Sequence, residues 1–168
     1  MEETASPAKR AVTFFATGLG LGYSPVAPGT VGSLWGVLIV VGLAAWGPGL
    51  AAYIAVCAGL TLLAIPVCHV AEQVLRKKDD GRIVADEFLT FPICMIGLPV
   101  GWEYAWLLAF AFCTNRFFDI IKLPPARQLD RWAHGGGVGI TLDDAAACLY
   151  SLAANWAAYL LVTRYLLD

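Results

Sequence analysis

Charged side chains are scarce in this sequence. Asp, Glu, Lys and Arg make up 14% of its 168 residues, whereas about 25% is usual in soluble proteins. Residues 11–71 contain none of the four types. A soluble domain of this size could not easily bury so much apolar surface. The sequence therefore predicts a single domain over residues 1–168 that is embedded in a membrane.

Signatures of several other protein classes are missing. The net charge of -2 and the lack of a long basic patch give no sign of nucleic-acid binding. The five cysteines lie in apolar segments, and none forms a CxxC pair. We therefore interpret them as small packing residues rather than as disulfides or metal ligands.

Five apolar segments alternate with polar blocks along the chain. A run of about 20 apolar residues is long enough to cross a bilayer as a helix, and the sequence Gly47-Pro48-Gly49 predicts a tight turn between the first two segments. We expect an all-α integral membrane bundle of four to five short transmembrane helices. The segments cover residues 31–46, 50–70, 88–102, 104–115 and 145–163.

The basic residues near the ends of these segments predict the orientation. If each segment crosses the bilayer once, the basic groups fall on one side, which the positive-inside rule identifies as the cytoplasm. Three polar segments, residues 17–33, 72–87 and 116–144, then meet at the cytoplasmic face. The basic residues are Lys9 and Arg10, then Arg76, Lys77, Lys78 and Arg82, then Arg116, Lys122, Arg127 and Arg131.

The first polar segment, residues 17–33, is rich in glycine and reads TGLGLGYSPVAPGTVGS. Glycines leave backbone N–H groups accessible, and Thr30 and Ser33 add hydroxyls at the start of a predicted helix, where an anion is favoured. The alternative is a flexible interfacial loop in which Ser33 is an ordinary N-cap.

The second polar segment ends in two acids at the start of an apolar run. Asp86 and Glu87 follow Ile83, Val84 and Ala85, and Phe88 comes next. Carboxylates at membrane depth are costly and face a partner, an ion or a water-filled cavity. We interpret both acids as functional, whereas Asp79 or Asp80 is better explained as a helix cap.

The third polar segment, residues 116–144, mixes acids, bases and glycines. In a helix Asp119 and Lys122 share one face, although an ordinary surface ion pair has the same spacing. Thr141 could cap the last helix, and its dipole would then favour Asp143 and Asp144. Gly135, Gly136, Gly137 and Gly139 suggest either close backbone approach or a turn. Other polar residues of the segment include Arg116, Arg127, Asp130, Arg131 and His134.

Together these acids and bases favour phosphoryl chemistry. Ligands that are all oxygen favour Mg²⁺ over zinc, and Lys or Arg would neutralise phosphate oxygens. Positioning and charge neutralisation then supply most of the catalysis. Motifs of the cysteine phosphatases, of the histidine-based lipid phosphatases and of the DxDx[TV] type are absent. A metal-activated water is the expected nucleophile, and a covalent carboxylate intermediate stays open.

Four pieces of the sequence resemble the phosphatidylglycerophosphatase A family: SPVAPGTVGS, VADE, NRFFDIIK with a following PxRQLDR, and HGGGVGITLDD. The resemblance implies a Mg²⁺-dependent enzyme of the bacterial inner membrane that hydrolyses phosphatidylglycerophosphate to phosphatidylglycerol and phosphate. It implies these catalytic and metal-binding acids: Asp86, Glu87, Asp119, Asp143 and Asp144. It implies these substrate-binding residues: Thr30, Ser33, Arg116, Lys122 and Arg127.

The chain departs from the family pattern at two points. Phe88-Leu89-Thr90 stands where the family has Gly soon after Asp-Glu, and Leu123 precedes the expected proline. Two other functions would use some of the same residues. A small ion-coupled transporter would use the same acids but place them near the bilayer midplane. A phosphotransferase of the CDP-alcohol type would need further aspartates that are not at the required spacing.

Overall fold

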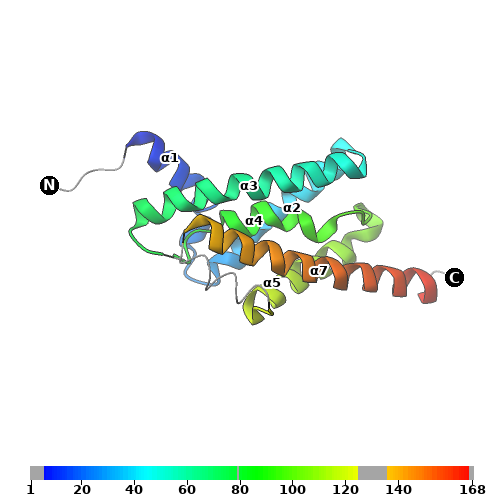
Figure 1. Cartoon of the computed structure of the whole chain (residues 1–168). Coiled ribbons are helices and arrows are strands. Elements are labelled where there is room, and N and C mark those ends of the chain that lie inside the picture. The colour runs from blue at the N-terminus through cyan, green and yellow to red at the C-terminus, as the bar shows by residue number, and fades with distance from the viewer. Residues whose placement is uncertain (1–5, 79, 125–135, 167–168) are drawn as a thin grey trace.

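The protein is a bundle of helices, as the computed structural model shows for residues 6–78, 80–124 and 136–166 (Figure 1). These residues contain no strand, which confirms the all-α prediction. The helices are α1 (Pro7–Ala16), α2 (Pro28–Trp46), α3 (Leu50–Leu75), α4 (Ala85–Thr90), α5 (Ala105–Ile121) and α7 (Gly137–Leu166). Short 3₁₀ turns are η1 (Leu21–Tyr23), η2 (Phe91–Met95) and η3 (Trp102–Tyr104).

Three of the described helices, α2, α3 and α7, are long and apolar enough to cross a membrane. Large apolar side chains on their outer faces are exposed, such as Leu38, Leu62 and Leu161. Exposed apolar patches of this extent indicate contact with lipid rather than water. The chain is therefore a membrane protein, and the expected total of four to five spans stays a prediction.

The predicted segment 88–102 is not a continuous helix. It is divided between α4 and η2, and Pro92 lies in the first turn of η2. Proline lacks the N–H that a continuing α-helix needs. Most of α4 and all of η2 are buried, and both elements pack against α2, α3 and α7. Broken helices are tolerated at membrane depth when protein surrounds them.

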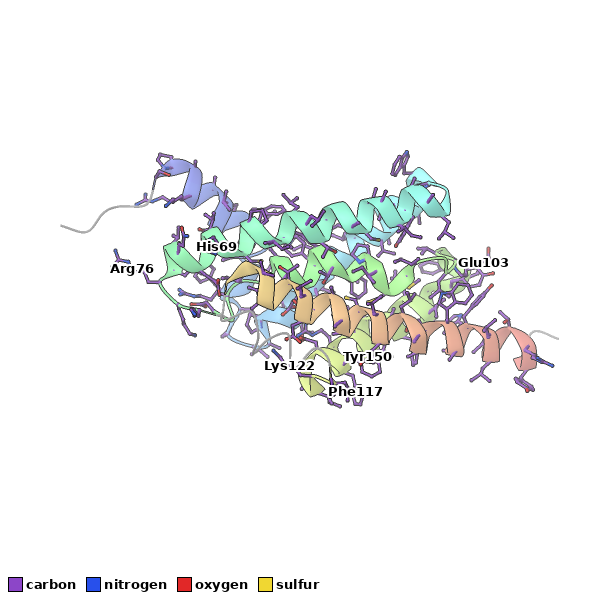
Figure 2. All side chains as sticks on the ribbon, in the orientation of Figure 1. His69, Arg76, Glu103, Phe117, Lys122 and Tyr150 are labelled. Carbon is purple, nitrogen blue, oxygen red and sulfur yellow. The ribbon has the colours of Figure 1, made fainter. Side chains whose placement is uncertain are left out.

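The turn between α2 and α3 is the predicted one. Gly47 adopts a left-handed conformation with φ 67° and caps α2 through its N–H, and α3 begins at Leu50. The hairpin returns the chain to the end from which α2 started. In Figure 2, Arg76 beyond α3 lies at the left end of the bundle and Glu103 lies at the right end. The polar segments around Arg76 are thus separated from the turn near Glu103.

Helix α1 was not predicted from the sequence. Ser6 accepts a hydrogen bond from the Lys9 N–H and Pro7 occupies the first turn, which is the usual start of a helix. The helix packs against α3. The apolar run after Lys9 is therefore a separate short helix and not the beginning of the first spanning segment.

Glycines of α2 allow α4 to approach closely. A Cβ atom on Gly32 would lie 2.5 Å from Cβ of Val84, and one on Gly36 would lie 2.5 Å from Cβ of Phe91. A Cβ atom on Gly29 would lie 2.2 Å from Oε1 of Glu87. These glycines belong to the helix and are not part of a loop. The close contact fixes the depth and direction of α4, which carries two of the predicted acids.

Candidate active site

The first turn of α4 carries the two acids that the sequence singled out. Asp86 is 7% exposed, and its Oδ1 accepts a hydrogen bond from the Glu87 N–H at 3.1 Å. Thr90 donates its hydroxyl to the Asp86 carbonyl oxygen at 2.7 Å and so completes the short helix. A buried carboxylate needs a charged or hydrogen-bonding partner. The surroundings of α4 supply such partners.

Arg116 of α5 connects three helices. Its Nη1 lies 2.6 Å from Oε2 of Glu87 and 3.0 Å from Oγ of Ser33, and its Nη2 lies 2.5 Å from Oδ2 of Asp119. Ser33 of α2 also donates to Oε2 of Glu87 at 2.7 Å. Ser33 is therefore not the N-cap considered above, because α2 begins at Pro28 and the N-cap position is Ala27.

A second ion pair joins α5 to α7. Lys122 adopts a left-handed conformation with φ 48° at the end of α5, and its Nζ lies 2.5 Å from Oδ2 of Asp143. Figure 2 labels Lys122 beside the first turns of α7. Asp144, the next residue, is 9% exposed. The acids of α7 are thus buried next to the end of α5.

The capping interpretation of Thr141 is wrong. Helix α7 begins at Gly137, so that Thr141 is a buried residue inside the helix and both aspartates lie beyond the first turn. The glycines before them serve close packing, because a Cβ atom on Gly137 would lie 1.9 Å from the carbonyl oxygen of Ile65 in α3. Helix capping therefore does not account for Asp143 and Asp144.

A cavity of about 250 Å³ brings the predicted acids together. It opens between α4, α5 and α7, and Gly81 and Ile83 of the preceding turn form part of its wall. Gly81 and the three apolar residues of the wall (Ile83, Ile120 and Ile140) could not be predicted from the sequence, because none of them carries a charged or metal-binding group. The lining residues are Gly81, Ile83, Asp86, Glu87, Asp119, Ile120, Lys122, Ile140, Asp143 and Asp144.

Burial and mutual repulsion act on the carboxyl groups of α4, which is not one of the three spanning helices. Burial raises the pKa of Asp86, and the nearby charges of Glu87 and Asp119 raise it further. Burial also raises the pKa of Glu87 to about 7, although Arg116 and Ser33 act in the opposite direction. Carboxylates that are buried close together favour binding of a cation.

Three of the five acids in this arrangement are paired with basic side chains. Among the described residues no group of three or more His, Cys, Asp or Glu side chains could hold a metal ion as it stands. Arg116 forms ion pairs with Glu87 and Asp119, and Lys122 forms one with Asp143. The donors are nevertheless all carboxylate oxygens around one cavity, which is the chemistry that Mg²⁺ prefers. Reorientation of these side chains would be needed to complete such a site.

Some of the predicted residues lie elsewhere. Thr30 is partly buried in the first turn of α2 and is not among the residues that line the cavity. Arg127, Asp130, Arg131 and His134 lie outside the described residues, as does Asp79. Asp80 is not a helix cap, because α3 ends with Arg76 as its C-cap and α4 begins after Val84 as its N-cap. Its carboxylate instead pairs with Arg82 at 2.7 Å.

Comparison with known proteins identifies relatives along nearly the whole chain. The family model described as Phosphatidylglycerophosphatase A matches residues 14–159. Phosphatidylglycerophosphatase A of Escherichia coli strain K12 is 33% identical over 152 residues, which cover 84% of this chain and 83% of the relative. The protein of the same name from Haemophilus influenzae is 35% identical over 147 residues, which cover 87% of both chains.

A third relative has a different name. A protein of Bacteroides thetaiotaomicron, provisionally named a phosphatidylinositol-3-phosphatase, is 32% identical over 137 residues, which cover 80% of this chain and 85% of the relative. No solved structure matches the chain. The family match over most of the chain and the two relatives of the same name show that the chain belongs to the phosphatidylglycerophosphatase A family.

Proposed function

We propose that this protein hydrolyses phosphatidylglycerophosphate to phosphatidylglycerol and inorganic phosphate, with Mg²⁺ as cofactor, as a step of glycerophospholipid synthesis. The main support for this proposal is the acidic cavity, because all five carboxylates predicted from the sequence line it. Two relatives that match most of the chain have the name of this enzyme. Membership of this family does not favour the ion-coupled transporter.

Two basic side chains would receive the phosphate. Arg116 and Lys122 each lie 2.5 Å from a carboxylate oxygen and can exchange that carboxylate for a phosphoryl oxygen. Charge-assisted hydrogen bonds to phosphate are among the stronger polar interactions in proteins. If these hydrogen bonds become stronger in the transition state, where negative charge shifts between the phosphate oxygens, they lower the activation barrier of hydrolysis.

The carboxylates would hold the metal ion and handle protons. Asp86, Glu87, Asp119, Asp143 and Asp144 are the residues around the cavity that can hold Mg²⁺. When bound, Mg²⁺ supplies charge neutralisation and a more acidic water. We propose that water attacks the phosphorus, that the bond from phosphorus to the glycerol oxygen breaks, and that a carboxylate of the cavity accepts the proton of the water. This proton then passes to the leaving glycerol oxygen, which gives the hydroxyl of phosphatidylglycerol.

The site would lie at the cytoplasmic face of a bacterial inner membrane. The acids occupy the beginning of α4, the end of α5 and the beginning of α7, as the bounds of these helices show. A lipid in the adjacent leaflet could present its head group there without leaving the bilayer. The basic residues at this end of the bundle support the cytoplasmic orientation.

The proposal is tested with the purified wild-type protein in detergent. We expect release of phosphate from phosphatidylglycerophosphate when Mg²⁺ is present and none after chelation with EDTA. Phosphatidylinositol 3-phosphate serves as the comparison substrate, because of the name of the Bacteroides relative. Absence of hydrolysis with every divalent cation, or a clear preference for the inositol lipid, would contradict the proposed function.

A further inference from the structure

A second cavity adjoins the acidic one at the same end of the bundle. It measures about 400 Å³ and shares the lining residue Gly81 with the acidic cavity. Its walls come from η1, the start of α2, the residues after α3 and the turn before α4. The lining residues are Gly22, Tyr23, Ser24, Pro28, Lys77, Asp80, Gly81 and Arg82.

Arg82 is held in a fixed position in this second cavity. Oδ1 of Asp80 accepts hydrogen bonds from the Arg82 backbone N–H at 3.0 Å and from Nε at 2.9 Å, and Oδ2 accepts from Nη2 at 2.7 Å. Asp80 itself is 4% exposed. The hydrogen bonds from Arg82 lower the pKa of Asp80 to about 2, so the pair is ionised at neutral pH. The Nη1 group takes no part in this pair and can meet another acceptor.

The loop before α2 packs against Arg82. Cζ of Arg82 lies 5.6 Å from the centre of the Tyr23 ring, within the range of a cation–π interaction. A Cβ atom on Gly22 would lie 2.0 Å from the Arg82 carbonyl oxygen. Only glycine therefore allows this approach, which places the Tyr23 ring beside the guanidinium.

The charge of this second cavity differs from that of the first. Among the described lining residues, Lys77 and Arg82 contribute two positive charges and Asp80 contributes one negative charge. The excess of one positive charge suits a group with one negative charge, such as a phosphodiester. The arginine side chain is 40% exposed and its geometry matches phosphate oxygens.

We propose that the second cavity binds the phosphodiester of the same lipid whose phosphomonoester enters the acidic cavity. The inference rests on the proposed function, since phosphatidylglycerophosphate carries both groups on one glycerol. Lys77 and Arg82 then determine specificity. They favour a lipid with two phosphates over phosphatidate, which has a phosphomonoester and no phosphodiester.

The test compares two lipids in micelles of nonionic detergent that contain no other anionic lipid. For each variant, kcat and KM are measured with phosphatidylglycerophosphate and with phosphatidate. Arg82→Gln should lower the ratio of the two kcat/KM values about tenfold, mainly by raising KM for the diphosphate lipid. Lys77→Gln, which leaves the pair of Asp80 and Arg82 intact, should lower the ratio about threefold.

Arg76→Gln is the matched control. It removes a positive charge one residue from Lys77, but Arg76 does not line the cavity, and the ratio should stay at the wild-type value. If Arg82→Gln does not fold, Lys77→Gln decides the test alone. The inference is overturned if the variants lower kcat/KM equally for both lipids. It is also overturned if their effect appears only after phosphatidylglycerol is added, because the cavity would then bind a neighbouring lipid and not the substrate. Turnover of phosphatidylglycerophosphate by the wild-type protein is measured first. If the wild type is active, a negative result with the variants contradicts only the role of the second cavity and not the proposed function.

Discussion

At the scale of single residues, Arg116 links three helices beside the acidic cavity. It contacts Ser33, Glu87 and Asp119, which come from three different helices. Its side chain is 15% exposed, and those of Glu87 and Asp119 are 14% and 17% exposed. Removing such a cation leaves two nearly buried carboxylates without their counter-charge, which is costly.

Arg116→Gln should therefore lower kcat for phosphate release by about 100-fold or more, the usual result of removing one donor to the transition state. Arg116→Lys keeps the charge but loses the forked geometry, so it should retain an intermediate kcat. Steady-state kinetics, with thermal unfolding in detergent as a check on folding, measure both. Full activity of Arg116→Gln would show that this arginine has no part in the reaction.

The gathering of the five acids at one end of the molecule could be predicted from the sequence, because charged residues are so rare in it. Asp86 and Glu87 stand out since they begin an apolar segment, and the cavity contains them as expected. The contact of Ser33 with Glu87 could not be predicted, since 54 positions separate the two residues. The capping role of Thr141 was wrong because glycine is a weak helix former, and nothing in the sequence indicated that α7 begins at Gly137.

At the scale of helices, the contact of α2 with α4 determines where the acids lie. Ala at Gly32 or Gly36 would place Cβ 2.5 Å from a side-chain carbon of the opposite element. Such crowding costs about 1–3 kcal/mol, so Gly32→Ala and Gly36→Ala should lower the unfolding temperature in detergent and reduce activity through displacement of α4.

Gly42→Ala is the control on the same helix. A Cβ atom at Gly42 meets nothing within 4 Å among the described residues, and alanine favours helix over glycine. This variant should unfold at the wild-type temperature or slightly above it. Equal unfolding temperatures for Gly32→Ala, Gly36→Ala and Gly42→Ala would contradict the importance of the close contact.

The hairpin of α2 and α3 was predicted closely, whereas α4 was not. Long uncharged runs and the Gly-Pro-Gly turn indicate a hairpin directly. The segment 88–102 has the same apolar composition, but it packs inside the bundle as a short helix and a 3₁₀ turn. Composition alone does not distinguish a segment buried in protein from one that crosses lipid.

At the scale of the whole molecule, the two ends of the bundle should face opposite sides of the membrane. Arg76 lies at one end and Glu103 at the other (Figure 2), next to Trp102, which is 94% exposed. We expect a cysteine introduced at Arg76 to be protected from a membrane-impermeant thiol reagent in intact bacterial cells, and one introduced at Trp102 to react. The native cysteines are replaced first, and lysed cells serve as the control. Reaction at position 76 alone would reverse the proposed orientation.

The central claim is that the acidic cavity is the site of hydrolysis. The most direct measurement is phosphate release from phosphatidylglycerophosphate by Asp86→Asn and Asp144→Asn, with Glu103→Gln as a control at the opposite end of the bundle. Each Asn variant should lose at least about 100-fold in kcat while it keeps the wild-type unfolding temperature within a few degrees, because asparagine preserves the size of the side chain. Glu103→Gln should keep wild-type activity. Wild-type turnover by both Asn variants would contradict the account.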